Sequence, residues 1–469
     1  MTSFQLYKLL GMYLSYRTSI NMIHVKNMAP FPDVTVCNLN PLWIATSSRL
    51  NVTWTYEDYL KRLSDFFSME GNHIRDDQRY LFDSLYTYEG YLQYFSEDDL
   101  SQIQDHLVWD CLWEYGEGSV PESCWGDIHR HVSPYYGPCS TFHVTKPSNW
   151  QGQPSRLIMI LFVNDFEQGE IKDFFLSSYY TFSSGARLLV HPRGTFPLLD
   201  EGVNLPPGHE TTIRVHAIKR QQMGQPYGSC VEQNHLKTDH AGNEKYTYTD
   251  RVCNKFCLQD YIIDNCGCID PYTPFPKSYR GIEDDGIEFC GLLNFDNTLT
   301  VNKTLKNLEC LAYLDIDGVC NCAQACTQHQ YNLDVFQVPW PHINYHQAFY
   351  KKYIKPSNFA DKFGVYKDID EKLQVDKNAG FDMLRNTDLI QRNFLEISIL
   401  LDSEQTTMME DYPVLSLESL FGNMGGILNL WVGIIFVTAV EIIDLLYVSL
   451  SNKKDRTLLK LARTDRGSC

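Results

Sequence analysis

The chain has 469 residues, which is enough for one large domain or for several. Its 58 acidic side chains outnumber 40 basic ones, so the formal net charge is -18. This balance argues against a nucleic-acid partner, because phosphate contacts need a basic surface. An acidic surface is compatible with attraction of cations and also with plain solubility.

The N-terminal stretch "MTSFQLYKLLGMYLSYRTSI" has an apolar part too short to cross a bilayer, and it contains Lys8. It lacks the small-residue cleavage site that follows the apolar run of a secretory signal peptide. We interpret residues 1–22 as the outer part of a first transmembrane helix whose inner part precedes residue 1.

Residues 23–417 are expected to form one α+β body with helical additions. Alternating or continuous apolar runs predict strands. The expected strands are 34–39, 155–163, 186–192, 211–218 and 393–401, the last of them directly before a membrane helix. Amphipathic patterns with acidic starts predict helices over 56–67 and 96–110. Three cysteines among Gly and Pro indicate stapled loops over 111–139.

The chain contains 15 Cys, many of them clustered at 253–268 and 320–326. Structural zinc sites favour paired C-x2-C ligands, whereas the spacings here are C-x3-C, C-x-C and C-x-C-x3-C. Glycosylation acceptors at Asn51 and Asn302 point to the extracellular side, where disulfides persist. We therefore expect disulfides, and no metal or cofactor.

No charged residue occurs between Glu418 and Glu441, a stretch long enough to span a bilayer. It predicts a second transmembrane helix over 418–450. The basic tail that follows, 451–469, lies in the cytosol by the positive-inside rule, which places residues 23–417 outside the cell.

Signatures of common catalytic sites are absent. The segment "HETTIRVH" lacks the H-E-x-x-H spacing that binds zinc, and neither a G-x-S-x-G nucleophile elbow nor a P-loop occurs. We expect that the chain is not an enzyme.

Motifs in a shared order cover nearly the whole chain. They are "FQLYKLLGMYLSY" (4–16), "FPDVTVCNLNP" (31–41), "GPCSTFH" (137–143), "SSGARLLVHPRGTFPLLDEGVNLPPGHETTI" (183–213), "CNKFCLQDYIIDNCGC" (253–268), "CNCAQAC" (320–326), Trp340-Pro341 and "GNMGGILNLWVGIIFVTAVEIID" (422–444). This series resembles the degenerin, epithelial sodium channel and acid-sensing ion channel family.

The resemblance implies two transmembrane helices flanking a large disulfide-rich ectodomain, with a central β palm and a helical finger, knuckle and thumb. It implies a trimer of identical or homologous subunits in the plasma membrane, with sodium ions as cargo and amiloride-type blockers. It also implies seven disulfides. The spacing of the cysteines alone does not determine which of them pair. The implied pairs are Cys37–Cys139, Cys111–Cys124, Cys230–Cys326, Cys253–Cys322, Cys257–Cys320, Cys266–Cys310 and Cys268–Cys290, with Cys469 left alone.

One face of the second membrane helix carries small residues. Gly422, Gly426, Asn429 and Gly433 lie within about 60° of one another at roughly 100° per residue. This stripe suits a water-filled lining, and it equally suits close helix packing. The resemblance places a gain-of-function position at Gly422 and the action of amiloride-type blockers at Asn429.

Two carboxylates follow at membrane depth, where an ionised group is costly and usually faces water. The helical register places Asp444 on the small-residue stripe and Glu441 roughly 60–100° away. The resemblance instead implies that Glu441 is the pore carboxylate, because the family often interrupts this helix at a Gly-x-Ser belt. Here the belt is Gly433-Ile434-Ile435, so backbone carbonyls would line it without the usual hydroxyl.

These features predict a subunit of a trimeric, sodium-preferring cation channel that an extracellular neuropeptide gates through the ectodomain. Protons and mechanical load are alternative stimuli within the same family. The rival class is a non-conducting receptor, which explains the cysteines but not Glu441 and Asp444. The Tyr-rich insert at 55–110 forms either a ligand cleft or a structural knuckle.

Overall fold

A computed structural model gives the fold. It describes residues 2–25, 30–39, 56–68, 107–114, 120–133, 136–144, 155–164, 183–232, 236, 246–270, 273, 287–293, 295, 300–401, 406–432, 437–438 and 440–450. The chain divides into two compact units. One comprises Met1–Asn21, Met223–Ser229 and Glu410–Cys469, and the other comprises Met22–Gln222 and Cys230–Met409.

The larger sheet has eight strands in the order β1-β13-β10-β12-β7-β3-β4, and β11 pairs with β10. The bounds are β1 Thr18–Val25, β3 Val108–Glu114, β4 Glu122–Ser123, β7 Arg156–Phe162, β10 His209–Gln221, β11 Thr327–Pro339, β12 Phe394–Leu401 and β13 Thr406–Pro413. Strands β10 and β12 pair in parallel, whereas β11 and β7 pair antiparallel with β10 and β12 respectively.

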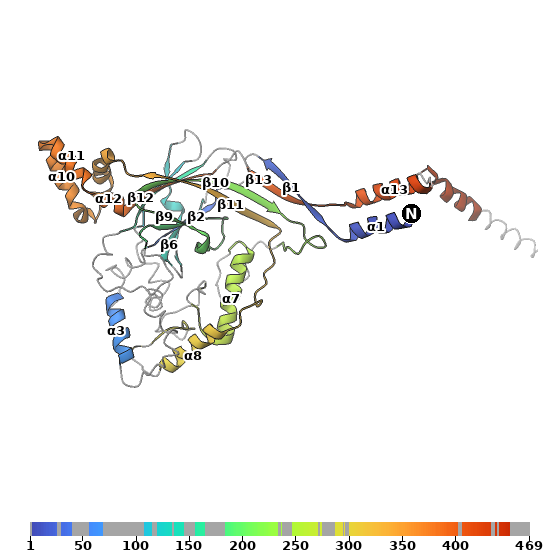
Figure 1. Cartoon of the computed structure of the whole chain (residues 1–469), viewed down its shortest axis with the longest axis horizontal. Helices are drawn as coiled ribbons and strands as arrows, with labels where there is room; N and C mark the ends of the chain where they lie inside the picture. Colours follow the sequence, from blue (N-terminus) through green and yellow to red (C-terminus); the bar gives the residue numbers. More distant parts are fainter. Residues whose placement is uncertain are drawn as a thin grey trace, which may run out of the picture. The chain divides into compact units, whose positions relative to one another are not determined.

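The smaller sheet has five strands in the order β5-β6-β2-β8-β9. The bounds are β2 Asp33–Asn38, β5 Ile128–Ser133, β6 Gly137–Phe142, β8 Ala186–His191 and β9 Val203–Leu205. The two sheets form separate layers (Figure 1), and one apolar cluster joins them. Val36 of β2, Met159 of β7 and Ile397 of β12 are among its fully buried members.

A second apolar cluster covers the opposite face of the larger sheet. Because side chains alternate along a strand, Leu157, Met159 and Leu161 face the first cluster, while Ile160 and Phe162 face the second. Short helices that follow β11 contribute Phe349, Tyr366, Ile369, Leu384 and Ile390 to this second cluster. They are α9 His346–Phe349, α10 Gly364–Val375, α11 Lys377–Arg385 and α12 Leu389–Asn393.

Helices α7 (Asp250–Cys266) and α8 (Thr300–Tyr313) contact each other in the cysteine-rich region (Figure 1). The Thr249 side chain caps α7 by accepting a hydrogen bond from the Val252 amide, and Gly267 ends the helix at a φ of 67°. Seven disulfides occur among the described residues, with the pairing that the resemblance implies. They are Cys37–Cys139, Cys111–Cys124, Cys230–Cys326, Cys253–Cys322, Cys257–Cys320, Cys266–Cys310 and Cys268–Cys290.

Several local expectations are confirmed. The strands expected at 34–39, 155–163, 186–192 and 211–218 correspond to β2, β7, β8 and β10. The helix expected over 56–67 is α3 (Tyr56–Ser68), whose Leu63 and Phe66 are buried. The rest of the 55–110 insert before residue 107 lies outside the described residues.

Other expectations are wrong. The end of the helix expected over 96–110 is strand β3, because Val108, Cys111 and Trp113 all reach the core between the sheets, with a bulge between Val108 and Asp110. The loops expected over 111–139 consist largely of strands, because Cys111 and Cys139 sit within paired strands. Strand β12 is not the last strand, since the polar, Met-containing β13 follows it.

The smaller unit contains helices α1 (Thr2–Leu14) and α13 (Leu417–Val432). Helix α1 ends at Leu14 and β1 begins at Thr18, so the helical part of residues 1–22 is shorter than expected. Residues 440–450 are also helical. No helix among the described residues combines the length and the apolar character needed to cross a bilayer.

Candidate functional site

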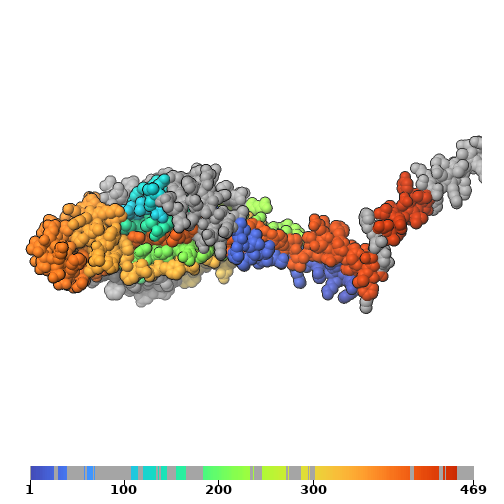
Figure 2. All heavy atoms as spheres, turned by 90° about the horizontal axis from the view of Figure 1, so that it is seen from above, coloured from blue at the N-terminus to red at the C-terminus, as the bar shows by residue number. Residues whose placement is uncertain are grey.

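Helix α13 packs against α1 through one face only. Leu420, Met424 and Ile427 of α13 meet Leu9 and Tyr13 of α1 in one apolar cluster. The two helices run side by side (Figure 2). The three α13 residues recur at i, i+4 and i+7, which places them on one side of the helix.

A hydrogen bond extends this contact. The indole Nε1 of Trp431 donates to Oε1 of Gln5 over 2.6 Å. Trp431 stands four residues after Ile427, so it continues the same face at about 100° per residue. The residues of α13 that contact α1 therefore form one stripe along the helix, which ends at Trp431.

The small residues lie on the opposite side of α13. Gly422, Gly426 and Asn429 are exposed, and a Cβ added at either glycine would meet no atom of the described residues within 4 Å. At about 100° per residue they point away from the face centred on Met424. We call these three residues the glycine–asparagine face. Packing against α1 does not explain it.

The two acids belong to the later helical segment. Glu441 and Asp444 are both exposed there, and neither has a hydrogen-bond or ion-pair partner within the described part of the chain. The expected belt, Gly433-Ile434-Ile435, lies outside the described residues. The choice between Glu441 and Asp444 as pore carboxylate stays a prediction.

Of the two glycosylation acceptors, Asn51 lies outside the described residues. Asn302 is exposed on the first turn of α8. The hydroxyl of Thr304, the third residue of its sequon, is turned inward and donates to the carbonyl of Leu292 over 2.7 Å. The asparagine side chain itself is accessible for a glycan.

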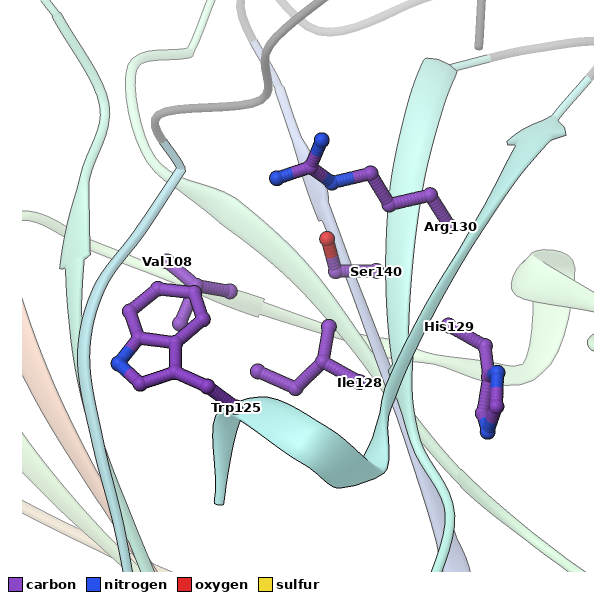
Figure 3. Close-up of a pocket in the computed structure, with 6 residues that line it drawn as sticks. All are labelled: Val108, Trp125, Ile128, His129, Arg130 and Ser140. Carbon is purple, nitrogen blue, oxygen red and sulfur yellow. The ribbon is translucent and has the colours of Figure 1, made fainter. Parts of the chain in front are cut away.

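A cavity of 380 Å³ opens between the two sheets (Figure 3). Its lining residues come from β3, from β5 and β6, and from the short turn at Trp125–Asp127. They are Val108, Trp125, Ile128, His129, Arg130 and Ser140. The Cys111–Cys124 disulfide joins β3 to the residue before this turn, so it fixes one wall to the other.

Behind β5 lies a buried polar network on the other face of the smaller sheet. His191 is 6% exposed and hydrogen-bonds through its two ring nitrogens to Thr35 and Thr195, each over 2.9 Å. Burial, with the nearby His131 and His143, lowers the pKa of His191 to about 3. This histidine is neutral at neutral pH and is a structural group.

A second titratable group lies on the larger sheet. Glu396 of β12 stands directly opposite Glu210 of β10 in the parallel register. Burial, followed by the negative charge of Glu210, raises the pKa of Glu396 to about 7, although Arg156 and a hydrogen bond from Trp340 oppose the shift. Glu396 is therefore partly protonated at neutral pH.

The family model described as amiloride-sensitive sodium channel matches residues 1–445 of this chain. The chain belongs to the amiloride-sensitive sodium channel family.

Three relatives illustrate the range of this family. An FMRFamide-activated amiloride-sensitive sodium channel of Cornu aspersum is 24% identical over 518 residues, covering 94% of this chain and 76% of its own. A degenerin-like protein, asic-2, of Caenorhabditis elegans is 25% identical and covers 96% of this chain and 79% of its own. An epithelial sodium channel subunit gamma of Bos taurus is 24% identical over 67% of this chain, which spans 43% of that protein.

A solved proton-activated chloride channel aligns with 96% of this chain and 92% of its own. Its identity is 5% and its TM-score 0.31, a likeness too weak to show a shared fold.

Sequence reasoning about this sodium channel family member missed Arg130, Trp125 and Glu396. The signal for Arg130 was present, because "DIHRHVS" alternates and assigns Ile128 and Arg130 to one face of a strand. Glu396 interrupts an apolar strand, which also marks it. Its neighbour Glu210 is remote in sequence and required the sheet register.

Proposed function

We propose that the chain is a subunit of a trimeric, sodium-preferring cation channel in the plasma membrane, gated through its ectodomain by an extracellular peptide. Residues 23–417 are the extracellular part, 418–450 the pore helix and 451–469 the cytosolic tail. The observation that carries this proposal is the open glycine–asparagine face of α13, directed away from α1.

One helix cannot enclose a water-filled pathway, so copies must assemble around an axis. The glycine–asparagine face suits that axis, because Gly422 and Gly426 let helices approach closely and Asn429 offers an amide to water. Glu441 and Asp444 would supply the negative potential that attracts cations. Amiloride-type blockers would act near Asn429.

A second surface supports assembly. Strand β11 lies at an edge of the larger sheet, and Val335, Phe336 and Val338 on it are 40%, 53% and 52% exposed. A long apolar edge strand invites contact with another chain. Identical or homologous subunits would cover it in a trimer.

The proposal of gating by a peptide rests on the similarity to the FMRFamide-activated relative. Chain connectivity gives a route for the signal. Three residues separate α1 from β1, and three separate β13 from α13. The Val414 amide also donates to the Arg17 carbonyl over 2.9 Å, which ties the two connections together. A rearranged sheet would therefore act on both helices at once.

Proton gating is a second candidate, which Glu396 favours. A carboxyl group with a pKa of about 7 beside Glu210 changes charge within the physiological pH range. Mechanical load is the third stimulus, and no specific feature among the described residues favours it.

The test is to record current from cells that express the full-length chain while FMRFamide, and separately acid pH, is applied. A sodium current evoked by the peptide supports the proposal, and one evoked only by acid favours the second candidate. Surface-expressed protein that carries no current under any stimulus would instead indicate a non-conducting receptor.

A matched pair of substitutions tests the pore face. Gly422→Trp places a bulky ring where neighbouring helices would cross, so a standing current without stimulus is expected. Leu430→Trp is the control, since Leu430 is 76% exposed and lies about 80° from Gly422 around α13, on the flank between the two stripes. Equal behaviour of the two variants would count against the assigned face.

A further inference from the structure

Strand β5 presents a charge to the space between the two sheets. Ile128 stands opposite Phe142 of β6, and Arg130 stands opposite Ser140, so Ile128 and Arg130 project from the same face. Phe142 belongs to the buried cluster between the sheets, and Ile128 packs against it. Arg130, which is exposed, therefore projects from the face of β5 on which Ile128 packs against the apolar core.

The guanidinium of Arg130 has no carboxylate partner. Within the described residues it forms neither an ion pair nor a hydrogen bond, whereas Arg251 and Lys303 of the same ectodomain are paired with Glu201 and Glu288. In Figure 3 its side chain extends over Ser140 toward Trp125 and Val108. A guanidinium presents a planar fork of donors that matches a carboxylate.

Three of the other lining residues are apolar, and the remaining two are His129 and Ser140. Val108 is 5% exposed, Ile128 is half-buried, and the Trp125 indole is 45% exposed beside them. Figure 3 shows these side chains on the side opposite the base of Arg130, while His129 points away from them. The lining thus combines the unpaired guanidinium of Arg130 with an aromatic and aliphatic surface. The cavity volume of 380 Å³ suits a single small molecule.

We propose that this cavity is a binding site for a small carboxylate that carries an apolar group the size of an aromatic side chain. The carboxylate pairs with Arg130, and the apolar group packs between Trp125, Val108 and Ile128. A cationic ligand is excluded by the charge of Arg130. The ligand holds the two sheets together next to the Cys111–Cys124 disulfide, which ties β3 to the residue before the Trp125–Asp127 turn. The proposal stands apart from peptide gating and from conduction.

The probe is 3-phenylpropionate, compared with its neutral amide, 3-phenylpropanamide, and with inorganic phosphate. Ligand-observed NMR on the purified full chain gives the dissociation constants. We expect the carboxylate to bind with a Kd below about 10 mM, as for a fragment of its size. Arg130→Gln should weaken that binding by about tenfold or more, because one charged hydrogen-bonding partner is lost.

The control is Arg220→Gln, which removes a charge of the same sign from β10, away from the cavity. It should leave the Kd unchanged. Trp125→Ala should weaken both the carboxylate and the amide, and unfolding temperatures verify that each variant is folded. The proposal is overturned if 3-phenylpropionate shows no Arg130-dependent binding, if the amide binds the wild type equally well, or if phosphate binds as tightly as the aromatic carboxylate.

Discussion

The rings of Tyr16 and Tyr227 meet edge to face, with centroids 5.4 Å apart and planes at 89°. Tyr16 lies just after α1, at a φ of 47° that few non-glycine residues adopt. Tyr227 lies in the segment after β10, three residues before Cys230, whose disulfide partner is Cys326. The pair joins the end of a helix to a covalently fixed loop.

Truncating this pair should weaken the response to stimulus. An edge-to-face pair is worth about 0.5–1.5 kcal/mol beyond its buried area, so Tyr227→Ala should shift the half-activating stimulus by roughly two- to tenfold. Tyr227→Phe keeps the ring and should behave as wild type. Dose–response curves at matched surface expression measure this. An unchanged Tyr227→Ala channel would show that the contact takes no part in gating.

His191 should make stability depend on acidity. Its folded pKa of about 3 lies below the usual 6.5, so the unfolded chain binds this proton first as pH falls. Its contribution is complete above pH 6.5 and is lost, by up to about 1.4 kcal/mol per pH unit, toward pH 3. Unfolding temperatures between pH 4 and pH 8 should fall more steeply for wild type than for His191→Gln. Parallel curves would contradict the assignment.

Glu396 should act in the opposite direction. Its folded pKa of about 7 exceeds the ordinary 4.5, so the folded chain keeps the proton and loses stability as pH rises from about 4.5 to about 7. Glu396→Gln removes the charge permanently and should stabilise the chain at pH 8 but have little effect at pH 5. Glu210→Gln should lower the pKa of Glu396 and reduce the difference. Melting curves at the two pH values provide the check, and a stabilisation equal at both would refute this account.

The helix hairpin α10–α11 depends on a glycine. A Cβ at Gly380 would lie 2.7 Å from the Leu373 side chain and 2.9 Å from its Cα, so Gly380→Ala should cost about 1–3 kcal/mol of stability. Gly364 starts α10 and has nothing within 4 Å of an added Cβ, so Gly364→Ala is the matched control. Denaturant unfolding should separate the two variants. Equal midpoints would mean that the hairpin is not packed this way.

The elements that could be predicted from the sequence are those whose apolar pattern is visible within their own residues. Strands β7, β8 and β10 have apolar runs or clear alternation, and α3 has a helical period. Strand β13 escaped prediction because "TTMMEDYP" is half polar, and its place in the sheet depends on distant partners. The first residues of strand β3 were predicted to be helical because they come directly after an amphipathic helical pattern, with no helix-breaking residue in between.

The candidate sites divide in the same way. The glycine–asparagine face is a helical pattern within one segment, so it could be recognised in the sequence. Only the packing of Met424 and Ile427 on α1 shows that this face points away from α1. The cavity at Arg130 needs β3 and β5, which belong to different sheets. The pairing of Glu396 with Glu210 likewise exists only in the folded register.

The most direct measurement of the central claim is the reversal potential of the evoked current under diluted NaCl and under replacement of sodium by potassium. The wild-type current should be cation-selective and sodium-preferring, and cation preference or conductance should be reduced in Glu441→Gln, or in Asp444→Asn if the helix is continuous. We expect Glu441 to be the determining residue. A current whose reversal follows chloride, or one that neither substitution alters, would contradict the assignment of this helix as the pore.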